Sequence, residues 1–124
     1  LPPLPEEVAS IWDGAFTADQ VARGEKAYQN ACADCHQPDL SGHEMSPPLA
    51  GVLFTFRWRN KTLEALFENV RMTMPQATPG SLGDQAYLDV IAFLLDANGY
   101  PRGNTELRPG MAELSEYRVE KPRG

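Results

Sequence analysis

The sequence lacks the features that mark membrane-spanning, β-rich and repetitive proteins. Its 124 residues contain no uninterrupted apolar run that approaches the roughly 20 residues a transmembrane helix requires. Apolar and polar residues never alternate for more than a few positions, and no segment repeats. These absences exclude a transmembrane helix in this stretch, an all-β fold and a repeat architecture, and they favour one all-α domain.

Positive charge is also scarce. The chain has 11 Lys and Arg residues against 17 Asp and Glu residues, which gives a formal net charge of −6. Because nucleic-acid binding requires a concentrated basic surface, this acidic excess predicts no nucleic-acid partner. Arg57, Arg59 and Lys61 are a local exception. They are equally consistent with an ordinary solvated loop and with a basic patch that overrides the total charge in docking.

Cysteine is rare, and both cysteines of the chain lie in one short motif, Cys32-Ala33-Asp34-Cys35-His36. Two thiols three positions apart, followed directly by an imidazole, are what covalent haem attachment requires. The thiols would form thioethers with the two haem vinyl groups, and His36 would bind the iron. A thioredoxin-like dithiol and half of a zinc site are the alternatives. The motif therefore predicts one covalently bound haem c.

Apolar periodicity predicts three main helices, over residues 17–34, 63–71 and 84–98. Thr17 and Gln20 have the spacing of a capping box at the start of the first helix, Thr62 is a suitable N-cap for the second, and Gly99 would end the third. A glycine inside a helix costs about 1 kcal/mol relative to alanine. Gly24 therefore predicts that another helix crosses the first one closely.

Loops and extensions make up the remainder. Proline and glycine interrupt residues 37–60, which are predicted to be mostly loop, and residues 72–83, which are predicted to be a second loop. The central domain spans residues 17–100. Residues 1–16 and 101–124 are N- and C-terminal extensions, and we expect both to pack on that domain. The N-terminal one is too apolar for a solvated tail. For the C-terminal one, a linker remnant or a partner-docking segment is the alternative. Short helical turns are predicted within residues 6–12 and 111–117.

These features together resemble a class I, monohaem cytochrome c of the bacterial soluble type. The resemblance covers residues 18–100 and implies the cytochrome c fold, with three main helices around one covalently attached haem. The matching motifs are Val21-x-x-Gly24-x-x-x-Tyr28-x-x-x-Cys32-x-x-Cys35-His36, Pro47-x-Leu49-x-Gly51, Trp58, Met74-Pro75 and Ile91-Ala92-Phe93-Leu94.

The resemblance also implies roles for residues around the haem. His36 would be the proximal ligand, and the carbonyl of Pro47 would accept a hydrogen bond from its other ring nitrogen, with Pro48 as the adjacent alternative. Trp58 would donate its indole N–H to a haem propionate. Arg59, or its neighbour Arg57, would add a charged hydrogen bond to the propionates.

The sixth ligand is the open position in this set. Four methionines and a second histidine are candidates, namely Met45, Met72, Met74, Met111 and His43. Met74 is favoured because the proline after it biases its backbone towards an extended conformation, in a loop between two predicted helices. The Met-Pro pattern of the family points to the same residue. Met72 would otherwise be a packing residue, and His43 a surface histidine.

Ligation by His36 and Met74 would fill both axial positions of the iron and leave no position for peroxide or a gas. We therefore predict an electron carrier and not an enzyme. It would be a monomer that shuttles single electrons between a quinol-oxidising complex or dehydrogenase and a terminal oxidase.

Because the sequence starts at Leu1 without Met, we expect a signal peptide or anchor to precede it, with export to the periplasm. A haem-based peroxidase or gas sensor with a weak or absent sixth ligand is the alternative.

Overall fold

The computed structural model describes residues 10–32, 36, 40–42, 48–74 and 78–120. In this part of the chain the helices are η1 (Ile11–Asp13), α1 (Ala18–Ala31), α3 (Val52–Trp58), α4 (Leu63–Thr73), α5 (Asp84–Ala97) and η2 (Ala112–Ser115). The same residues contain no strand, only two isolated β-bridges, and none of their helices is long and apolar enough to cross a bilayer. The predicted all-α class is confirmed.

The three main helices lie close to their predicted bounds because the predicted caps form. The Thr17 side chain accepts a hydrogen bond from the amide of Gln20, and the Thr62 side chain accepts one from Ala65, each at 3.1 Å. α1 ends at Ala31 rather than at residue 34. Gly99 follows α5 with a φ of 91°, in the left-handed region that stops a helix.

Residues 37–60 are predicted to be mostly loop, and that prediction does not identify α3. β-branched and aromatic residues make Val52–Trp58 a poor helix by local propensity. Tertiary packing overrides that preference, because Phe54 and Trp58, one turn apart, are both buried, at 1% and 8% exposed. The predicted loop at 72–83 also begins late, because α4 continues to Thr73.

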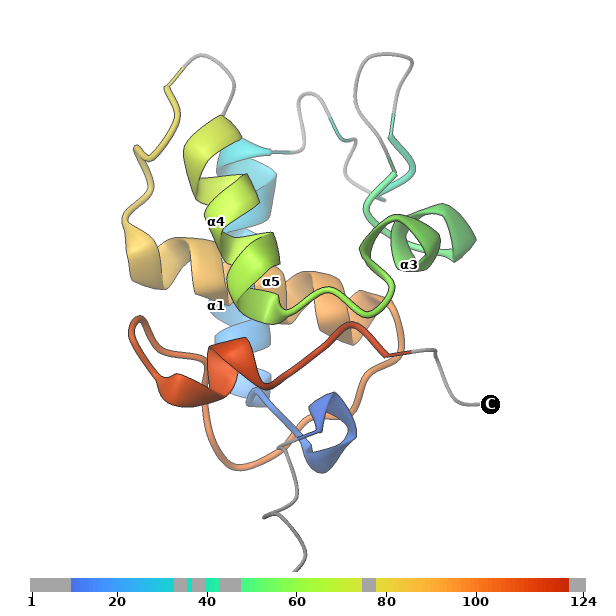
Figure 1. Ribbon diagram of the computed structural model, residues 1–124. Coiled ribbons are helices and arrows are strands. Elements are labelled where there is room, and N and C mark those ends of the chain that lie inside the picture. The colour runs from blue at the N-terminus through green and yellow to red at the C-terminus, as the bar shows by residue number, and fades with distance from the viewer. Residues whose placement is uncertain (1–9, 33–35, 37–39, 43–47, 75–77, 121–124) are drawn as a thin grey trace, which may run out of the picture.

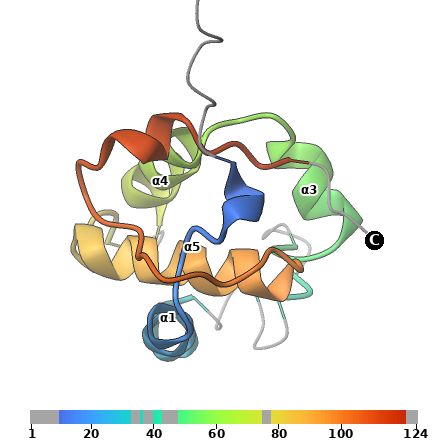
Figure 2. The same cartoon turned by 90° about the horizontal axis from the view of Figure 1, so that it is seen from below.

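Helix α5 lies at the centre of the molecule. Figure 1 shows α1 crossing behind α5, and Figure 2 shows α1 on one side of α5 and α4 on the other. α1 packs chiefly against α5, and α4 packs against both α5 and η2. Most of α5 is therefore buried, as its apolar sequence predicts, including Leu88, Ile91 and Leu95, which are fully buried.

The contact between α1 and α5 is centred on Gly24, as predicted. A Cβ atom at Gly24 would lie only 1.8 Å from the carbonyl oxygen of Asp89. One turn along α1, the rings of Tyr28 and Phe93 lie 5.4 Å apart between centroids. The two helices thus approach closely enough that only glycine fits between their backbones.

Both terminal segments pack on the helical body where they are described, as predicted. Ile11, Phe16, Leu107 and Val119 are fully buried. Figure 2 shows the C-terminal segment running beside α5 and then past α4 towards α3. Its end holds the α3–α4 connection through hydrogen bonds from Asn60 N to the Val119 carbonyl and from Val119 N to the Lys61 carbonyl, at 3.0 and 2.9 Å. Residues 1–9 and 121–124 of the two extensions lie outside the described residues.

Candidate functional site

Cys32 and His36 lie one helical turn apart at the C-terminal end of α1. The Cys32 amide caps the helix by donating to the Tyr28 carbonyl at 2.8 Å, and the His36 amide donates to the Cys32 carbonyl at 3.0 Å. His36 is 5% exposed, whereas Cys32 is partly buried. Cys35 lies outside the described residues. These two hydrogen bonds therefore hold a partly buried cysteine and a buried histidine in a fixed relation to α1.

The chain after His36 is fastened by its own backbone. The amide of Gly42 donates to the His36 carbonyl at 3.0 Å, and the amide of Leu49 donates to the Leu40 carbonyl at 2.9 Å. Leu40 is 4% exposed and has a φ of 67°, an uncommon conformation for leucine. Burial of its side chain offsets the cost of that conformation, so Leu40 anchors the start of this loop in the core.

Asn98, the C-cap of α5, fastens the other end of the same loop. Its side-chain amide donates to the Leu49 carbonyl at 3.0 Å, and its side-chain oxygen accepts from the Gly51 amide at 2.9 Å. The sequence indicates Asn98 only as a helix end, because both partners lie far away in the chain. Pro47 lies outside the described residues, and Pro48 is partly buried. The loop expected to support His36 is thus tied to α5.

Met74 has the extended backbone that the following proline predicts, with a φ of −128° and a ψ of 148°. It caps α4, and its amide donates to the Val70 carbonyl at 2.8 Å. Its carbonyl accepts a hydrogen bond from the Tyr87 hydroxyl at 2.7 Å. Met74 is partly buried, whereas Met72 is 68% exposed. Met74 is therefore held at the edge of the core by contacts to both α4 and α5.

Three further candidates for the sixth ligand remain. One lies away from the end of α4, and two lie outside the described residues. Met111 lies in the C-terminal segment, where its sulfur accepts a hydrogen bond from the Arg108 amide at 3.0 Å. Met45 and His43 lie outside the described residues. Met74 and Met111 are both partly buried, but Met74 follows α4 whereas Met111 packs against the core in the C-terminal segment.

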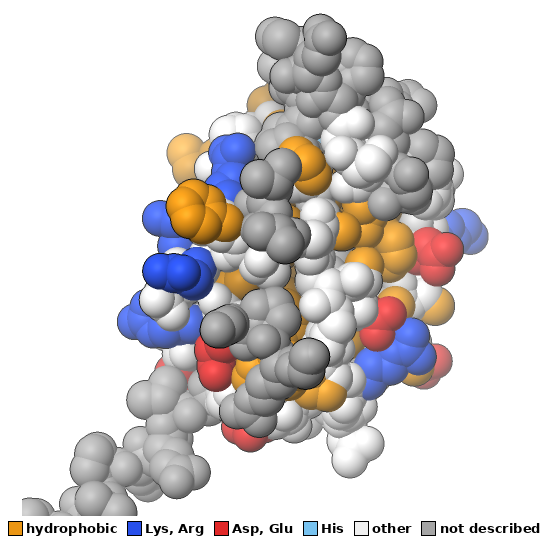
Figure 3. Space-filling view, turned by 90° about the vertical axis from the view of Figure 1, so that its right-hand side faces the viewer, with side chains coloured by type: hydrophobic (Ala, Val, Ile, Leu, Met, Phe, Trp, Pro, Cys, Tyr) orange, Lys and Arg blue, Asp and Glu red, His pale blue; other side chains and the backbone are white. Residues whose placement is uncertain are grey.

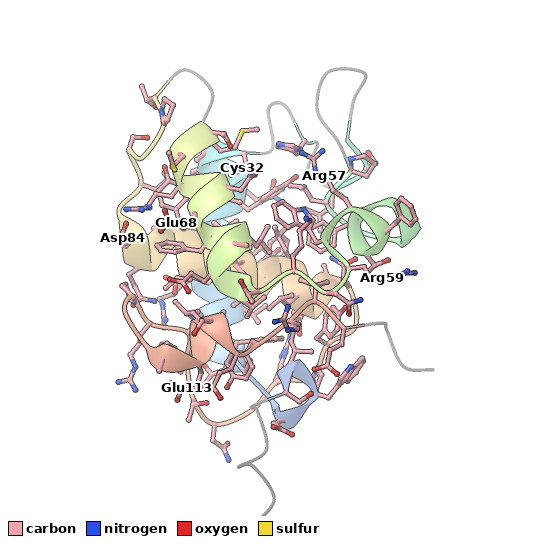
Figure 4. The ribbon with its side chains drawn as sticks, in the orientation of Figure 1. Cys32, Arg57, Arg59, Glu68, Asp84 and Glu113 are labelled. Carbon is pink, nitrogen blue, oxygen red and sulfur yellow. The ribbon has the colours of Figure 1, made fainter. Side chains whose placement is uncertain are left out.

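Trp58 is buried at the end of α3, and the Arg57 guanidinium carbon lies 6.0 Å from its ring centroid. Arg57 and Arg59 are both exposed. Figure 4 shows Arg57 on the side of the molecule where Cys32 lies, and Arg59 directed outward from the helices. Of the two arginines suggested for the propionates, Arg57 is therefore the one directed towards the Cys32 end.

Arg71 links the two helices that flank the Met74 loop. Its guanidinium bonds both carboxylate oxygens of Glu68, at 2.7 and 2.8 Å, and lies 3.9 Å from a carboxylate oxygen of Asp84 at the start of α5. The hydrogen bond with Glu68 raises the pKa of Arg71 above its ordinary value. Figure 4 shows Glu68 and Asp84 on the same side of the molecule. The side chains of Arg71, Glu68 and Asp84 are 37%, 44% and 49% exposed, so solvent screens these ion pairs and their contribution to stability is small.

The chemistry of this donor set fits a covalently attached haem. Cys32, with Cys35, would supply the thiols for attachment, and the buried imidazole of His36 would supply a nitrogen to the iron. The thioether of Met74 is a soft donor of the kind that completes such a site. Cys32 and His36 follow the C-terminal end of α1, and Met74 caps the C-terminal end of α4. Figure 1 shows these two helix ends at the same end of the molecule.

Comparisons with known proteins identify relatives of this chain. A family model described as cytochrome c oxidase, cbb3-type, subunit III matches residues 19–94. Among solved structures, a chain of the sulfane dehydrogenase SoxCD from Paracoccus pantotrophus is similar, with a TM-score of 0.55 and 25% identity. The alignment covers 86% of this chain and 61% of that chain, so this chain spans less than two thirds of its relative's length. No curated protein sequence matches.

Proposed function

The chain belongs to the family of cbb3-type cytochrome c oxidase subunit III, and we propose that it transfers single electrons through a haem ligated by His36 and Met74. Membership confirms the prediction of a c-type cytochrome with covalently bound haem c. The bound group supplies an iron that alternates between the ferrous and ferric states. The remaining chemistry belongs to the chain, which attaches the group through thiols, fixes the imidazole and presents the thioether.

The observation that carries this proposal is the fixed, partly buried position of Met74. Its amide and its carbonyl are both hydrogen-bonded, to α4 and α5, so its side chain starts from a defined point. A thioether is a neutral donor that favours the ferrous state and raises the reduction potential. With His36 and Met74 both bound, no position remains for peroxide or a gas, which favours electron transfer over catalysis or sensing.

Substituting Met74 and Met72 in turn tests the ligand. In Met74→Ala we expect the weak long-wavelength band of the ferric spectrum to disappear and the ferrous protein to bind carbon monoxide. Met72→Ala should keep the band and exclude carbon monoxide, because the Met72 side chain is 68% exposed. Absorption spectra of the two purified holoproteins show which of the two methionines is the ligand. A band that survives in Met74→Ala and vanishes in Met72→Ala contradicts the assignment.

The proposed partners are a quinol-oxidising complex or dehydrogenase as electron donor and a terminal oxidase as acceptor, in the periplasm. The names of the relatives support both classes, since one refers to an oxidase and the other to a dehydrogenase. SoxCD is an enzyme, and its chain is longer than this one. The same residues would therefore serve equally in a free carrier and in an electron-transfer module of a larger assembly.

We propose that the acceptor docks on a basic patch formed by Phe56, Arg57, Arg59, Lys61 and Arg118. All five side chains are exposed, Phe56 at 75%. The Arg118 guanidinium donates to the Asn60 carbonyl at 2.7 Å, which joins the C-terminal segment to the patch. Figure 3 shows Lys and Arg side chains gathered along one edge of this face, beside an exposed hydrophobic side chain. An apolar centre with a cationic rim suits a partner surface with an apolar centre and carboxylates around it.

Charge reversal tests the basic patch. In the double variant Arg59→Glu with Lys61→Glu, we expect electron transfer to a purified cbb3-type oxidase to slow about tenfold at low salt, and the difference to fade at high salt. The matched control is Lys26→Glu with Arg108→Glu, which makes the same change in net charge on exposed residues outside the patch. Stopped-flow oxidation of the ferrous proteins across ionic strength gives the rates. Equal slowing in both variants would mean that only total charge matters.

A further inference from the structure

Tyr87 joins the two ends of the loop that begins at Met74. It lies in the first turn of α5 and is 1% exposed. Its hydroxyl donates to the Met74 carbonyl at 2.7 Å, and the same oxygen accepts from the Leu82 amide at 3.4 Å. One buried hydroxyl thus contacts the backbone at both ends of the segment between α4 and α5.

We propose that Tyr87 is a positioning residue for the sixth ligand, because its hydroxyl fixes the peptide group from which the Met74 thioether projects. This inference rests on the proposed ligation by His36 and Met74. The amide of Met74 is bonded to α4 through the Val70 carbonyl. The Met74 carbonyl accepts from the Tyr87 hydroxyl, and this hydrogen bond fixes the orientation of the peptide group that follows Met74. Loss of the hydroxyl frees that peptide group to rotate and moves the sulfur relative to the iron.

The other described contacts around this loop constrain it less. Thr78 and Ser81 form a turn, with 3.0 Å between their side-chain oxygens, but this turn is exposed and bonded within itself. The Arg71–Asp84 pair spans the same two helices at 3.9 Å, and it is exposed to solvent, which screens it. The Tyr87 bond is made by a buried side chain, where competition from water is weakest.

A second tyrosine in the chain provides a matched control. Tyr100 is 2% exposed, and its hydroxyl also donates to a backbone carbonyl, that of Glu120 in the C-terminal segment. Tyr87→Phe and Tyr100→Phe therefore remove the same kind of buried hydrogen bond and keep the aromatic ring. They differ in that the Tyr87 hydroxyl bonds the backbone of Met74 and, at 3.4 Å, that of Leu82, whereas the Tyr100 hydroxyl bonds the C-terminal segment.

The test is the binding of imidazole to the ferric holoprotein, because imidazole has to displace the methionine sulfur. We expect Tyr87→Phe to bind imidazole about 10- to 100-fold more tightly than the unmodified protein, which is the usual range for loss of a group that supports a metal ligand. Tyr100→Phe should bind it unchanged. Thermal melting of both variants checks that their losses of stability are similar, so that stability does not account for the difference.

Three results would overturn the inference, and they are distinguishable. If Met74→Ala binds imidazole more tightly but Tyr87→Phe binds it like the unmodified protein, Tyr87 does not position the ligand, while the ligand assignment stands. If the unmodified protein lacks the long-wavelength band and binds imidazole as tightly as Met74→Ala does, the proposed ligation itself fails. Equal tightening in Tyr87→Phe and Tyr100→Phe would assign the effect to general loosening and also count against positioning.

Discussion

Replacing Gly24 by alanine is expected to destabilise the folded holoprotein by about 3 kcal/mol or more. The added Cβ would lie 1.8 Å from the Asp89 carbonyl oxygen, 2.5 Å from its carbonyl carbon and 3.0 Å from the Cβ of Phe93. The first two atoms are backbone, so no side-chain rotation relieves the collision. α1 and α5 would have to separate, and Cys32 at the end of α1 would move with the helix.

A loss of stability in Gly24→Ala would be informative, because helix propensity alone predicts a gain. Alanine is favoured over glycine inside a helix by about 1 kcal/mol, so an open position would show a gain in stability. Gly99→Ala is the matched control, since Gly99 has nothing within 4 Å of an added Cβ but has a φ of 91°. It should lose about 1 kcal/mol through backbone strain alone. Denaturant unfolding measures both, and a Gly24→Ala protein as stable as the parent would contradict the close crossing.

The features that could be predicted from the sequence are those with a local cause. Thr17 and Thr62 cap helices through amides three positions away, and Pro75 sets the backbone of Met74 directly. The contact at Gly24 is between distant residues, but a glycine inside a helix is destabilising. Its presence there therefore predicts a close helix crossing that only glycine allows. The motif that includes Cys32 and His36 also predicts its chemistry from adjacent residues.

The features that were missed depend on contacts between distant residues. α3 forms against its propensity because Phe54 and Trp58 are buried in the core, and no local pattern reveals that burial. The sequence indicates Tyr87 only as an apolar position on a helix face. Its hydrogen bond to Met74 joins residues 13 positions apart and has no local signal. Asn98 reads as a helix end, although its side chain bonds Leu49 across 49 residues.

A buried polar network around Gln20 is a further case of the same kind. Gln20 is fully buried, and its side-chain nitrogen donates to Asp89 at 3.0 Å and to the Leu107 carbonyl at 2.9 Å. Its side-chain oxygen accepts from the Leu107 amide at 2.9 Å. One side chain of α1 therefore binds α5 and both backbone groups of a residue in the C-terminal segment. The sequence indicates Gln20 only as half of a capping box, and its side chain is directed to these partners instead.

Replacing Gln20 by leucine is expected to cost about 3 kcal/mol, because the Leu107 amide would lose its partner in a fully buried position. Gln85→Leu is the matched control. The Gln85 side chain donates to the same two acceptors, at 3.0 and 3.1 Å, but it accepts nothing from Leu107 and its residue is exposed. Gln20 can still serve both acceptors in that variant, so we expect a loss below about 1 kcal/mol.

Denaturant unfolding and hydrogen exchange at the Leu107 amide together test this difference. In Gln20→Leu the amide should exchange much faster than in the parent, whereas in Gln85→Leu it should remain protected, because Gln20 still accepts from it. Equal losses of stability in the two variants would assign the effect to the shared acceptors and not to the Leu107 amide. Faster exchange in Gln20→Leu, with α1 still folded, would identify the Gln20 side-chain oxygen as the group that protects the Leu107 amide.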